Sequence, residues 1–358
     1  MSIRTDRLRQ FLAGIACDAV LVSKKENVRY YSGFSGSNAQ LLITPDQAWL
    51  LTDFRYVEQA TQQAPDFSIL RYSGSPYPVM TETLASAYPG KKLTIAFEGD
   101  FVVHDTFEAL KTALPESAWQ SCSLESLRMQ KDAEELRLIH QAMEISQQAF
   151  AQILPLIKPG ARECDIALEL EFAMRRRGAE GKAFDFIVAS GARGALPHGV
   201  ASEKELCEGE LVTLDFGAVY KGYHSDMTRT LCLGTASEKQ LEIYNLVLKA
   251  QEVGCAAIQP GITGKDVDAA ARQVIISGGY GEQFGHGLGH GLGLMIHEEP
   301  RLSPVGDRIL TIGTPVTVEP GIYLPGWGGV RIEDTVVVSA DGCINLTAGT
   351  GKELLEIR

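Results

Sequence analysis

The chain has 358 residues, of which 45% are hydrophobic and 22% are charged, and its formal net charge at neutral pH is −12. This composition is typical of a folded globular protein, excludes a disordered or fibrous one, and gives enough length for two domains. Because phosphate binding needs clustered Lys and Arg, the acidic balance argues against a nucleic-acid partner and favours multivalent cations.

No stretch approaches the roughly 20 continuous apolar residues that cross a membrane. The first residues, MSIRTDRLRQFL, also lack the apolar core and small-residue cleavage site of a signal peptide. We therefore expect a cytoplasmic protein with no membrane partner. Seven cysteines without a CxxC pair are scattered among apolar residues, which predicts reduced, mostly buried thiols rather than a disulfide framework or a zinc ribbon.

Residues 1 to about 125 alternate helix-like and strand-like segments. After an amphipathic opening, strand-like runs lie at 18–23, 39–44, 48–52 and 93–99. Strands interleaved with helices predict an α/β domain over residues 1–126. Within it, the Gly/Ser cluster YSGFSGSN at 31–38 predicts a tight loop.

The remaining residues, 127–358, are expected to form a second domain that opens with a helix from Asp132 to Ile157. Apolar residues recur along it at helical spacing: Leu136, Ile139, Met143, Phe150 and Ile153. Further helices are predicted at 163–177, 238–258 and 263–277, the last with Thr263 as N-cap and Gly278-Gly279 as its stop. Strands are predicted at 211–220, 224–233, 315–324 and 329–339.

Each of these four strands carries a carboxylate where an apolar residue would be the easier choice. The four are Asp215, Asp226, Glu319 and Glu333. An ionised carboxylate in apolar surroundings costs several kcal/mol unless something compensates it, and no basic residue is adjacent to Asp215 or Glu319. A bound cation would compensate the charge. Oxygen ligands with one imidazole suit Mn, Co, Zn or Fe, and several carboxylates can bridge two such ions.

The segment GHGLGHGLGLMIHEEP, residues 285–300, can supply the imidazole, because it places three histidines on a glycine-rich backbone. Glycine lets that backbone pass close to a metal or a substrate where a Cβ would clash. The segment does not read HExxH, which excludes a helical zinc-protease site. The DFG at 215–217 has no HRD loop or lysine-bearing partner strand, which excludes a kinase.

Together these motifs resemble the pita-bread metallopeptidases, which include aminopeptidase P, Xaa-Pro dipeptidase (prolidase) and methionine aminopeptidase. The resemblance rests on five stretches in the family's order: IVASGARGALPHG (187–199), LVTLDFGAVYKGYHSDMTRT (211–230), GHGLGHGLGLMIHE (285–298), VTVEPGIYLPG (316–326) and GGVRIEDTVVV (328–338). Residues 27–44 and 50–60 resemble the amino-terminal domain of the aminopeptidase P and prolidase branch. The resemblance implies an N-terminal creatinase-like α/β domain, 1–126, and a C-terminal pita-bread catalytic domain, 127–358.

Carried over to this sequence, the resemblance implies that two divalent ions, Mn²⁺ or Co²⁺ with Zn²⁺ or Fe²⁺ as alternatives, are held by Asp215, Asp226, His290, Glu319 and Glu333. Asp226 and Glu333 would bridge the ions, and Glu319 would also shuttle the proton. His198 and His297 match histidines that contact the substrate or the tetrahedral intermediate. Arg331 matches an arginine near the substrate, and His286 fits the pattern as support behind the ligands.

The activity implied is that of an Xaa-Pro aminopeptidase, which uses a hydroxide bridging the metals, and the alternative is an Xaa-Pro dipeptidase. A dipeptidase needs an arginine for the substrate carboxylate, and the family spacing puts Val305 at that place, with Arg301 and Arg308 on either side. This departure favours the aminopeptidase. The complete ligand set argues against a metal-free creatinase and against a metal-free peptide-binding module. The expected partners are short proline-containing peptides and a second copy of the chain, in a homodimer built through the amino-terminal domain.

Overall fold

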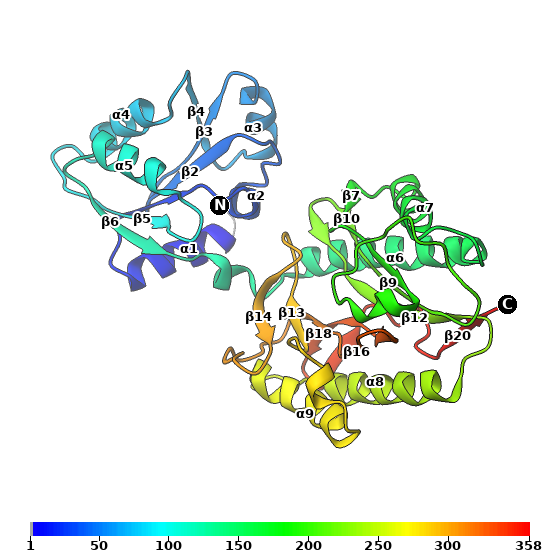
Figure 1. Ribbon diagram of the computed structural model, residues 1–358. Coiled ribbons are helices and arrows are strands. Elements are labelled where there is room, and N and C mark those ends of the chain that lie inside the picture. The colour runs from blue at the N-terminus through cyan, green and yellow to red at the C-terminus, as the bar shows by residue number, and fades with distance from the viewer. Residues whose placement is uncertain (1–2) are drawn as a thin grey trace. The chain divides into compact units, whose positions relative to one another are not determined.

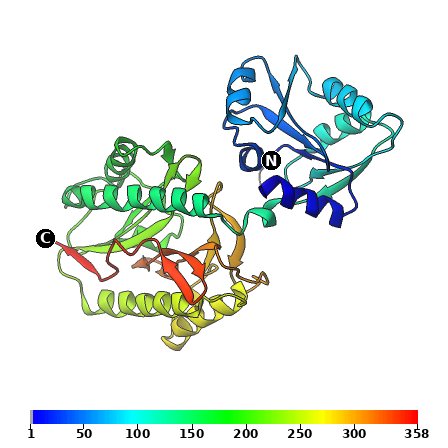
Figure 2. The same ribbon diagram turned by 180° about the vertical axis from the view of Figure 1, so that it is seen from behind.

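The computed structural model describes residues 3–358, and the chain divides into two compact units, Met1–Arg128 and Met129–Arg358. Figures 1 and 2 show the ribbon from two opposite sides. Within residues 3–358, no helix combines the length and the apolar composition that a membrane crossing requires.

The first unit is built on one mixed sheet with the strand order β4-β3-β2-β1-β5-β6. Its strands are β1 (Ala19–Val22), β2 (Ala39–Ile43), β3 (Ala48–Asp53), β4 (Ser68–Tyr72), β5 (Thr94–Glu98) and β6 (Ala118–Cys122). Its helices are α1 (Ile3–Gly14), α2 (Lys25–Ser32), α3 (Val57–Gln63), α4 (Tyr77–Ala87) and α5 (His104–Ala113). The predicted α/β architecture is thereby confirmed.

The backbone just before helix α2 is hydrogen-bonded to a buried carboxylate from strand β5. The side chain of Lys24, the N-cap residue, makes no capping bond, and Glu98, at the end of β5, accepts hydrogen bonds from the backbone N–H groups of Ser23 and Lys24 at 2.5 and 2.8 Å. These bonds satisfy donors that a helix start leaves open. The loop predicted at 31–38 starts later than expected, because α2 includes Tyr31 and Ser32 and is followed by Gly33 with a left-handed φ of 78°.

The second unit places two pairs of helices on opposite sides of its strands (Figures 1 and 2). Helices α6 (Ala133–Ile153) and α7 (Glu163–Arg176) lie on one side, and α8 (Glu238–Ala257) and α9 (Gly264–Ser277) on the other. Asp132 forms a capping box with Glu135 at the start of α6, and the predicted cap Thr263 accepts from the backbone N–H of Asp266 at the start of α9.

Two sheets lie between these helices. One has the order β20-β12-β9-β8 and the other β14-β13-β15-β18-β19. Their strands are β8 (Ile187–Ser190), β9 (Leu211–Phe216), β12 (Met227–Leu233), β13 (Gly289–Gly291), β14 (Glu298–Leu302), β15 (Pro315–Val318), β18 (Asp334–Ser339), β19 (Gly342–Asn345) and β20 (Leu355–Ile357). The smaller pieces are β7 (Gly181–Lys182), β10 (Ala218–Tyr220), β11 (Tyr223–His224), β16 (Gly321–Leu324) and β17 (Gly328–Arg331).

The second unit has two hydrophobic cores, and the first sheet contributes residues to both. Phe150 of α6 stacks on Phe216 of β9 with ring centroids 5.5 Å apart in the first core, and Val247 of α8 packs with Val316 of β15 in the second core. Burial of such side chains stabilises the fold by about 1.5–3 kcal/mol each. All seven cysteines are free thiols. Only Cys17 and Cys232 are buried, so the expectation of mostly buried thiols was wrong.

The four predicted long strands are each interrupted. The run 211–220 breaks at Gly217, where a Cβ would lie 1.9 Å from the carbonyl oxygen of Ser225. The other three break beside a carboxylate: Asp226 lies between β11 and β12, Glu319 between β15 and β16, and Glu333 between β17 and β18.

Candidate metal centre

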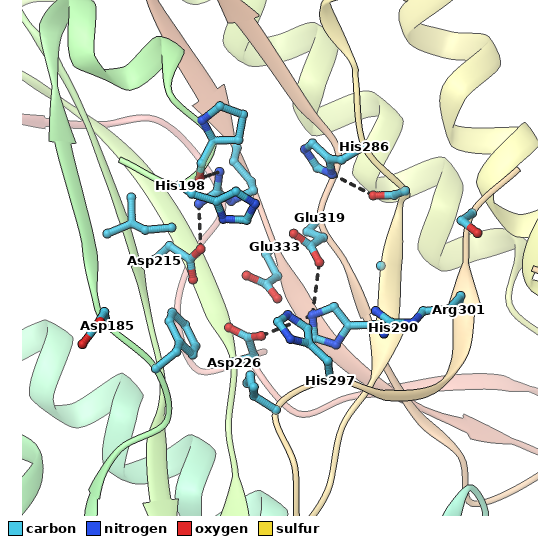
Figure 3. Close-up of a pocket in the computed structure, with 18 of the residues that line it drawn as sticks. Asp185, His198, Asp215, Asp226, His286, His290, His297, Arg301, Glu319 and Glu333 are labelled. Carbon is cyan, nitrogen blue, oxygen red and sulfur yellow. Dashed lines mark hydrogen bonds and ion pairs between the residues drawn. The ribbon is translucent and has the colours of Figure 1, made fainter. Parts of the chain in front are cut away.

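All five predicted metal ligands come together in one pocket of the second unit, shown in Figure 3. Asp215 projects from β9 and Asp226 directly precedes β12, so the first sheet supplies two carboxylates. His290 lies on β13 and Glu319 follows β15 of the second sheet. Glu333, between β17 and β18, completes the set. The two sheets therefore meet at this group of side chains.

Three of the carboxylates form a tight group. Asp215, Asp226 and Glu333 each offer an oxygen, and these atoms lie within 4.8 Å of one another. Asp226 and Glu333 are buried, with 5% and 1% of their surface exposed. Like charges at this distance in a buried site repel strongly unless protons or cations intervene.

One oxygen of each carboxylate in this group lacks a hydrogen-bond partner. Within the described part of the second unit, the buried side-chain nitrogen and oxygen atoms without a hydrogen bond are Asp215 Oδ1, Asp226 Oδ1 and Glu333 Oε1. Folded proteins rarely leave such atoms unsatisfied, and each exception calls for an explanation. Three hard oxygen donors that converge without hydrogen-bond donors fit divalent cations.

Burial and mutual repulsion raise the pKa values of these acids. Burial is the larger cause for Asp226 and Glu333, followed by the neighbouring carboxylates, and both pKa values rise well above their ordinary range. Burial also raises the pKa of Glu319 to about 7. The metal-free pocket therefore favours protonated acids, and dications would reverse that preference by stabilising the carboxylates.

His290 is oriented as a ligand by its own backbone. Its Nδ1 lies 3.0 Å from the carbonyl oxygen of Gly291, which can only accept, so Nδ1 carries the proton and Nε2 is left with a free lone pair. That Nε2 lies 3.6 Å from Asp226 Oδ2 and 3.4 Å from Glu319 Oε1. Burial lowers the pKa of His290 to about 3, which keeps the imidazole neutral.

The glycines on either side of His290 allow strand β13 to place this histidine at the pocket. A Cβ on Gly289 would lie 2.0 Å from the carbonyl oxygen of Thr317, and one on Gly291 would lie 2.3 Å from that of Glu299. Strand β13 can thus pass between β14 and β15 only without side chains at these two positions. Glycine at these two positions serves close packing of the backbone against neighbouring strands, whereas the sequence had predicted a close approach to a metal or a substrate.

Arg331 connects several parts of the pocket. Its guanidinium donates to Asp215 Oδ2 at 2.7 Å and to the hydroxyl of Thr228 at 3.1 Å. Thr228 in turn donates to Glu333 Oε2 at 2.8 Å, and Asp215 and Thr228 are direct cross-strand partners on β9 and β12. The arginine therefore fixes one oxygen of Asp215 and leaves the other directed at the carboxylate group.

Tyr323 is a pocket residue to which the sequence assigned no role. Its hydroxyl accepts from Arg331 Nη1 at 2.9 Å, so its proton is donated to His286 Nε2, also at 2.9 Å. His286 consequently carries its own proton on Nδ1, which faces the carbonyl oxygen of Gly287 at 2.8 Å. His286 is thereby linked to Arg331 through the hydroxyl of Tyr323, and it also lines the pocket.

The pocket holds about 390 Å³, and its lining includes two imidazoles and one guanidinium that no other described side chain engages by a hydrogen bond or an ion pair. His198, His297 and Arg301 line it, and their side chains make no hydrogen bond or ion pair to any other described residue. The rings of His297 and His290 lie 4.4 Å apart. Arg301 pairs with His290 across β13 and β14 and reaches toward it in Figure 3. Burial, and after it the charge of Arg301, lowers the pKa of His297.

Comparison with known proteins identifies the family. Residues 137–340 match the model of metallopeptidase family M24, and residues 4–130 match the creatinase/prolidase N-terminal domain. The chain belongs to metallopeptidase family M24. Enzymes of this family use divalent metals, so the expected fold, with a creatinase-like N-terminal and a pita-bread catalytic part, and the expected metallopeptidase class are confirmed.

Relatives of this M24 chain match it over nearly its whole length. It is 38% identical over 358 residues to the Xaa-Pro dipeptidase of Pyrococcus furiosus, covering 99% of this chain and 100% of the relative. The solved Xaa-Pro dipeptidase from Bacillus anthracis superposes with a TM-score of 0.95 at 43% identity over 99% of each chain. An X-Pro aminopeptidase from Thermotoga maritima superposes with a TM-score of 0.91 at 40% identity, covering 99% of this chain and 100% of that one.

Proposed function

We propose that this M24 enzyme is an Xaa-Pro dipeptidase that works with two divalent ions, Mn²⁺ or Co²⁺ foremost, held by Asp215, Asp226, His290, Glu319 and Glu333. The unpartnered oxygens of three of these carboxylates support the assignment. The dipeptidase replaces the aminopeptidase favoured by the sequence, because the names of the relatives support it better and because Arg301 lines the pocket.

Arg301 is the observation that carries this choice. A dipeptide substrate brings a free carboxylate immediately after proline, and its burial requires a cation. The guanidinium of Arg301 faces the pocket without a carboxylate partner among the described residues. A charge-assisted bond from Arg to a carboxylate can be bidentate, which would orient the dipeptide as well as bind it.

The apolar wall of the same pocket supports a preference for proline. Phe184, Ile187, Pro197, Val200 and Ile296 line it. The pyrrolidine ring is apolar, and the tertiary amide before it has no N–H that would need an acceptor. A wall without an acceptor at that place therefore discriminates against secondary amides, whose N–H would stay unpaired.

When bound, two dications supply electrophilic activation of the attacking water and the scissile carbonyl. Glu319 is suited to receive the proton of that water and to pass it to the leaving nitrogen, because only its Oε1 is engaged, by the hydroxyl of Thr317 at 3.1 Å. The imidazoles of His198 and His297 are free to donate to the developing oxyanion or to the peptide. A well-placed donor of this kind contributes roughly 3–4 kcal/mol to transition-state stabilisation.

The test compares three substrates with the metal-loaded protein: Ala-Pro, Ala-Pro-Ala and Ala-Pro-amide. We expect kcat/KM for Ala-Pro to exceed that for the other two by about tenfold or more, since a bond to a charged group contributes roughly 1.5–3 kcal/mol. Faster cleavage of Ala-Pro-Ala would identify an aminopeptidase instead. Binding of metal without cleavage of any of the three would contradict both activities.

A further inference from the structure

The loop that carries His198 is closed at its base by one buried carboxylate. We call residues 191–201 the His198 loop. Ser190, the last residue of β8, precedes it, and Ser202 follows it. Glu163, the first residue of α7, is fully buried. Its Oε1 accepts from the backbone N–H and the hydroxyl of Ser190, both at 2.8 Å. Its Oε2 accepts from the N–H and the hydroxyl of Ser202 at 3.2 and 2.7 Å.

A fifth donor comes from within the loop. Arg193 Nη1 bonds to Glu163 Oε2, and Arg193 Nη2 donates to the carbonyl oxygen of Val200 at 2.7 Å. The carboxylate thus binds both ends of the loop and, through Arg193, also Val200 near its C-terminal end. None of these five bonds is to the backbone of α7, the helix that Glu163 begins. The side chain of the N-cap residue of α7 makes no capping bond either.

The far side of the loop lies directly on β17. A Cβ on Gly329 would lie 2.1 Å from the carbonyl oxygen of Gly194, so the two backbones touch without side chains between them. Arg331, which also binds Asp215, donates to the carbonyl oxygen of Pro197 at 3.3 Å. The loop is therefore supported from β17 at its middle and from Glu163 at its ends.

His198 depends on this support. Its imidazole makes no hydrogen bond or ion pair to other described residues, and it lies at the pocket beside Pro197. Its place relative to the substrate is consequently set by the loop backbone alone. A shift of about 1 Å in a group that contacts the reacting atoms can reduce the rate by a factor of about 100.

We propose that Glu163 is a positioning residue that holds His198 at the substrate by tying together the ends of the His198 loop. The inference rests on the proposed function, in which His198 contacts the peptide. Glu163 itself does not line the pocket, so its effect on the reaction must pass through the loop.

A double-mutant cycle with the metal-loaded enzyme tests this coupling. Glu163→Gln, His198→Ala and the double variant are compared with wild type for kcat and KM on Ala-Pro, with bound metal measured for each. We expect Glu163→Gln to lower kcat/KM about tenfold or more in wild type and less than about twofold in the His198→Ala background, with metal content unchanged. A general loss of stability would reduce activity by the same factor in both backgrounds.

Two further variants keep the test decisive. Ser202→Ala removes only one of the hydroxyl groups that donate to Glu163. If Glu163→Gln does not fold, Ser202→Ala takes its place in the cycle. The smaller loss of activity expected for Ser202→Ala must also disappear in the His198→Ala background. Glu98→Gln is the matched control, because Glu98 is also fully buried and accepts backbone N–H groups but lies in the first unit, outside the His198 loop.

Equal fold-losses in both backgrounds, or full activity of His198→Ala, would overturn the positioning role. Failure of the proposed function is distinguishable, because it is read from wild type alone, as absence of Ala-Pro cleavage.

Discussion

Buried carboxylates in the second unit differ in what their oxygens bind. Glu163 receives five donors, and Asp334 is paired with Arg229 at 2.9 Å and Lys352 at 3.1 Å. Asp226 and Glu333 are equally buried yet each keeps an oxygen without any donor. Since an unpaired buried charge is strongly destabilising, the first pair can be explained by folding alone, whereas Asp226 and Glu333 need protons or cations to neutralise them.

Arg301→Met should separate substrate recognition from chemistry. Methionine keeps much of the apolar stem and removes the charge, so we expect kcat/KM for Ala-Pro to fall roughly 10–100-fold, mainly through KM, and that for Ala-Pro-amide to change little. The measurement is steady-state kinetics on both substrates. Arg308→Met is the matched control, because Arg308 is exposed on the same segment and does not line the pocket. Equal losses on both substrates would contradict the role of Arg301.

The arginine also shows where sequence reasoning stopped. Counting back from Glu319 pointed to Val305, which is 86% exposed and does not line the pocket. Arg301 reaches the pocket because it pairs with His290 across two strands whose register shifts between His290 and Gly291. Residue spacing along one chain cannot predict such a register, since it depends on how two strands meet.

At the scale of the elements, the sequence predicted four extended segments of the second unit but not where they stop pairing, and it did not predict the shorter strands, such as β8, β13 and β14. The apolar pattern continues through 315–324 and 329–339. Pro320-Gly321 is a local signal for the break at Glu319, whereas nothing local marks the break at Glu333. Each break turns a residue out of its ladder, so its carboxylate can leave the sheet and enter the pocket. The helices were predicted closely, because caps such as Thr263 are local signals.

Strand β13 should be intolerant of any side chain at Gly289. The Cβ of Gly289→Ala would lie 2.0 Å from a backbone oxygen of β15, so one of the strands must move. We expect a loss of about 1–3 kcal/mol in the free energy of unfolding and a marked loss of metal affinity, because His290 follows directly. Urea denaturation and metal titration measure the two effects.

Gly285→Ala is the control for this strand, since a Cβ there would meet nothing within 4 Å. It should leave both quantities nearly unchanged. Similar behaviour of the two variants would mean that β13 can adjust, and that close packing is not the reason for glycine beside His290.

At the scale of the whole molecule, the metal centre exists only in the folded chain. Its proposed ligands extend from Asp215 to Glu333 in the sequence and come from two sheets. Ions that bind only the folded state stabilise it by mass action, by about 2.7 kcal/mol per site at a free concentration 100 times the dissociation constant. Chelation should therefore lower the melting temperature by several degrees.

The effect of chelation should depend on pH. In the metal-free protein the pKa of Glu319 is raised from 4.5 to about 7, and those of Asp226 and Glu333 are raised as well. Between pH 4.5 and about 7, the folded state keeps a proton on Glu319 that the unfolded state releases. The free energy of unfolding therefore falls as pH rises, by roughly 3 kcal/mol for Glu319 alone. Bound dications replace those protons and remove the loss.

The difference in melting temperature between metal-loaded and chelated protein should consequently widen from pH 5 to pH 8 in calorimetric scans. In the metal-free Glu319→Gln variant, the melting temperature should decline less steeply with pH. A constant difference, or a metal-free protein that becomes more stable as pH rises, would mean that these carboxylates are not the groups that the ions neutralise.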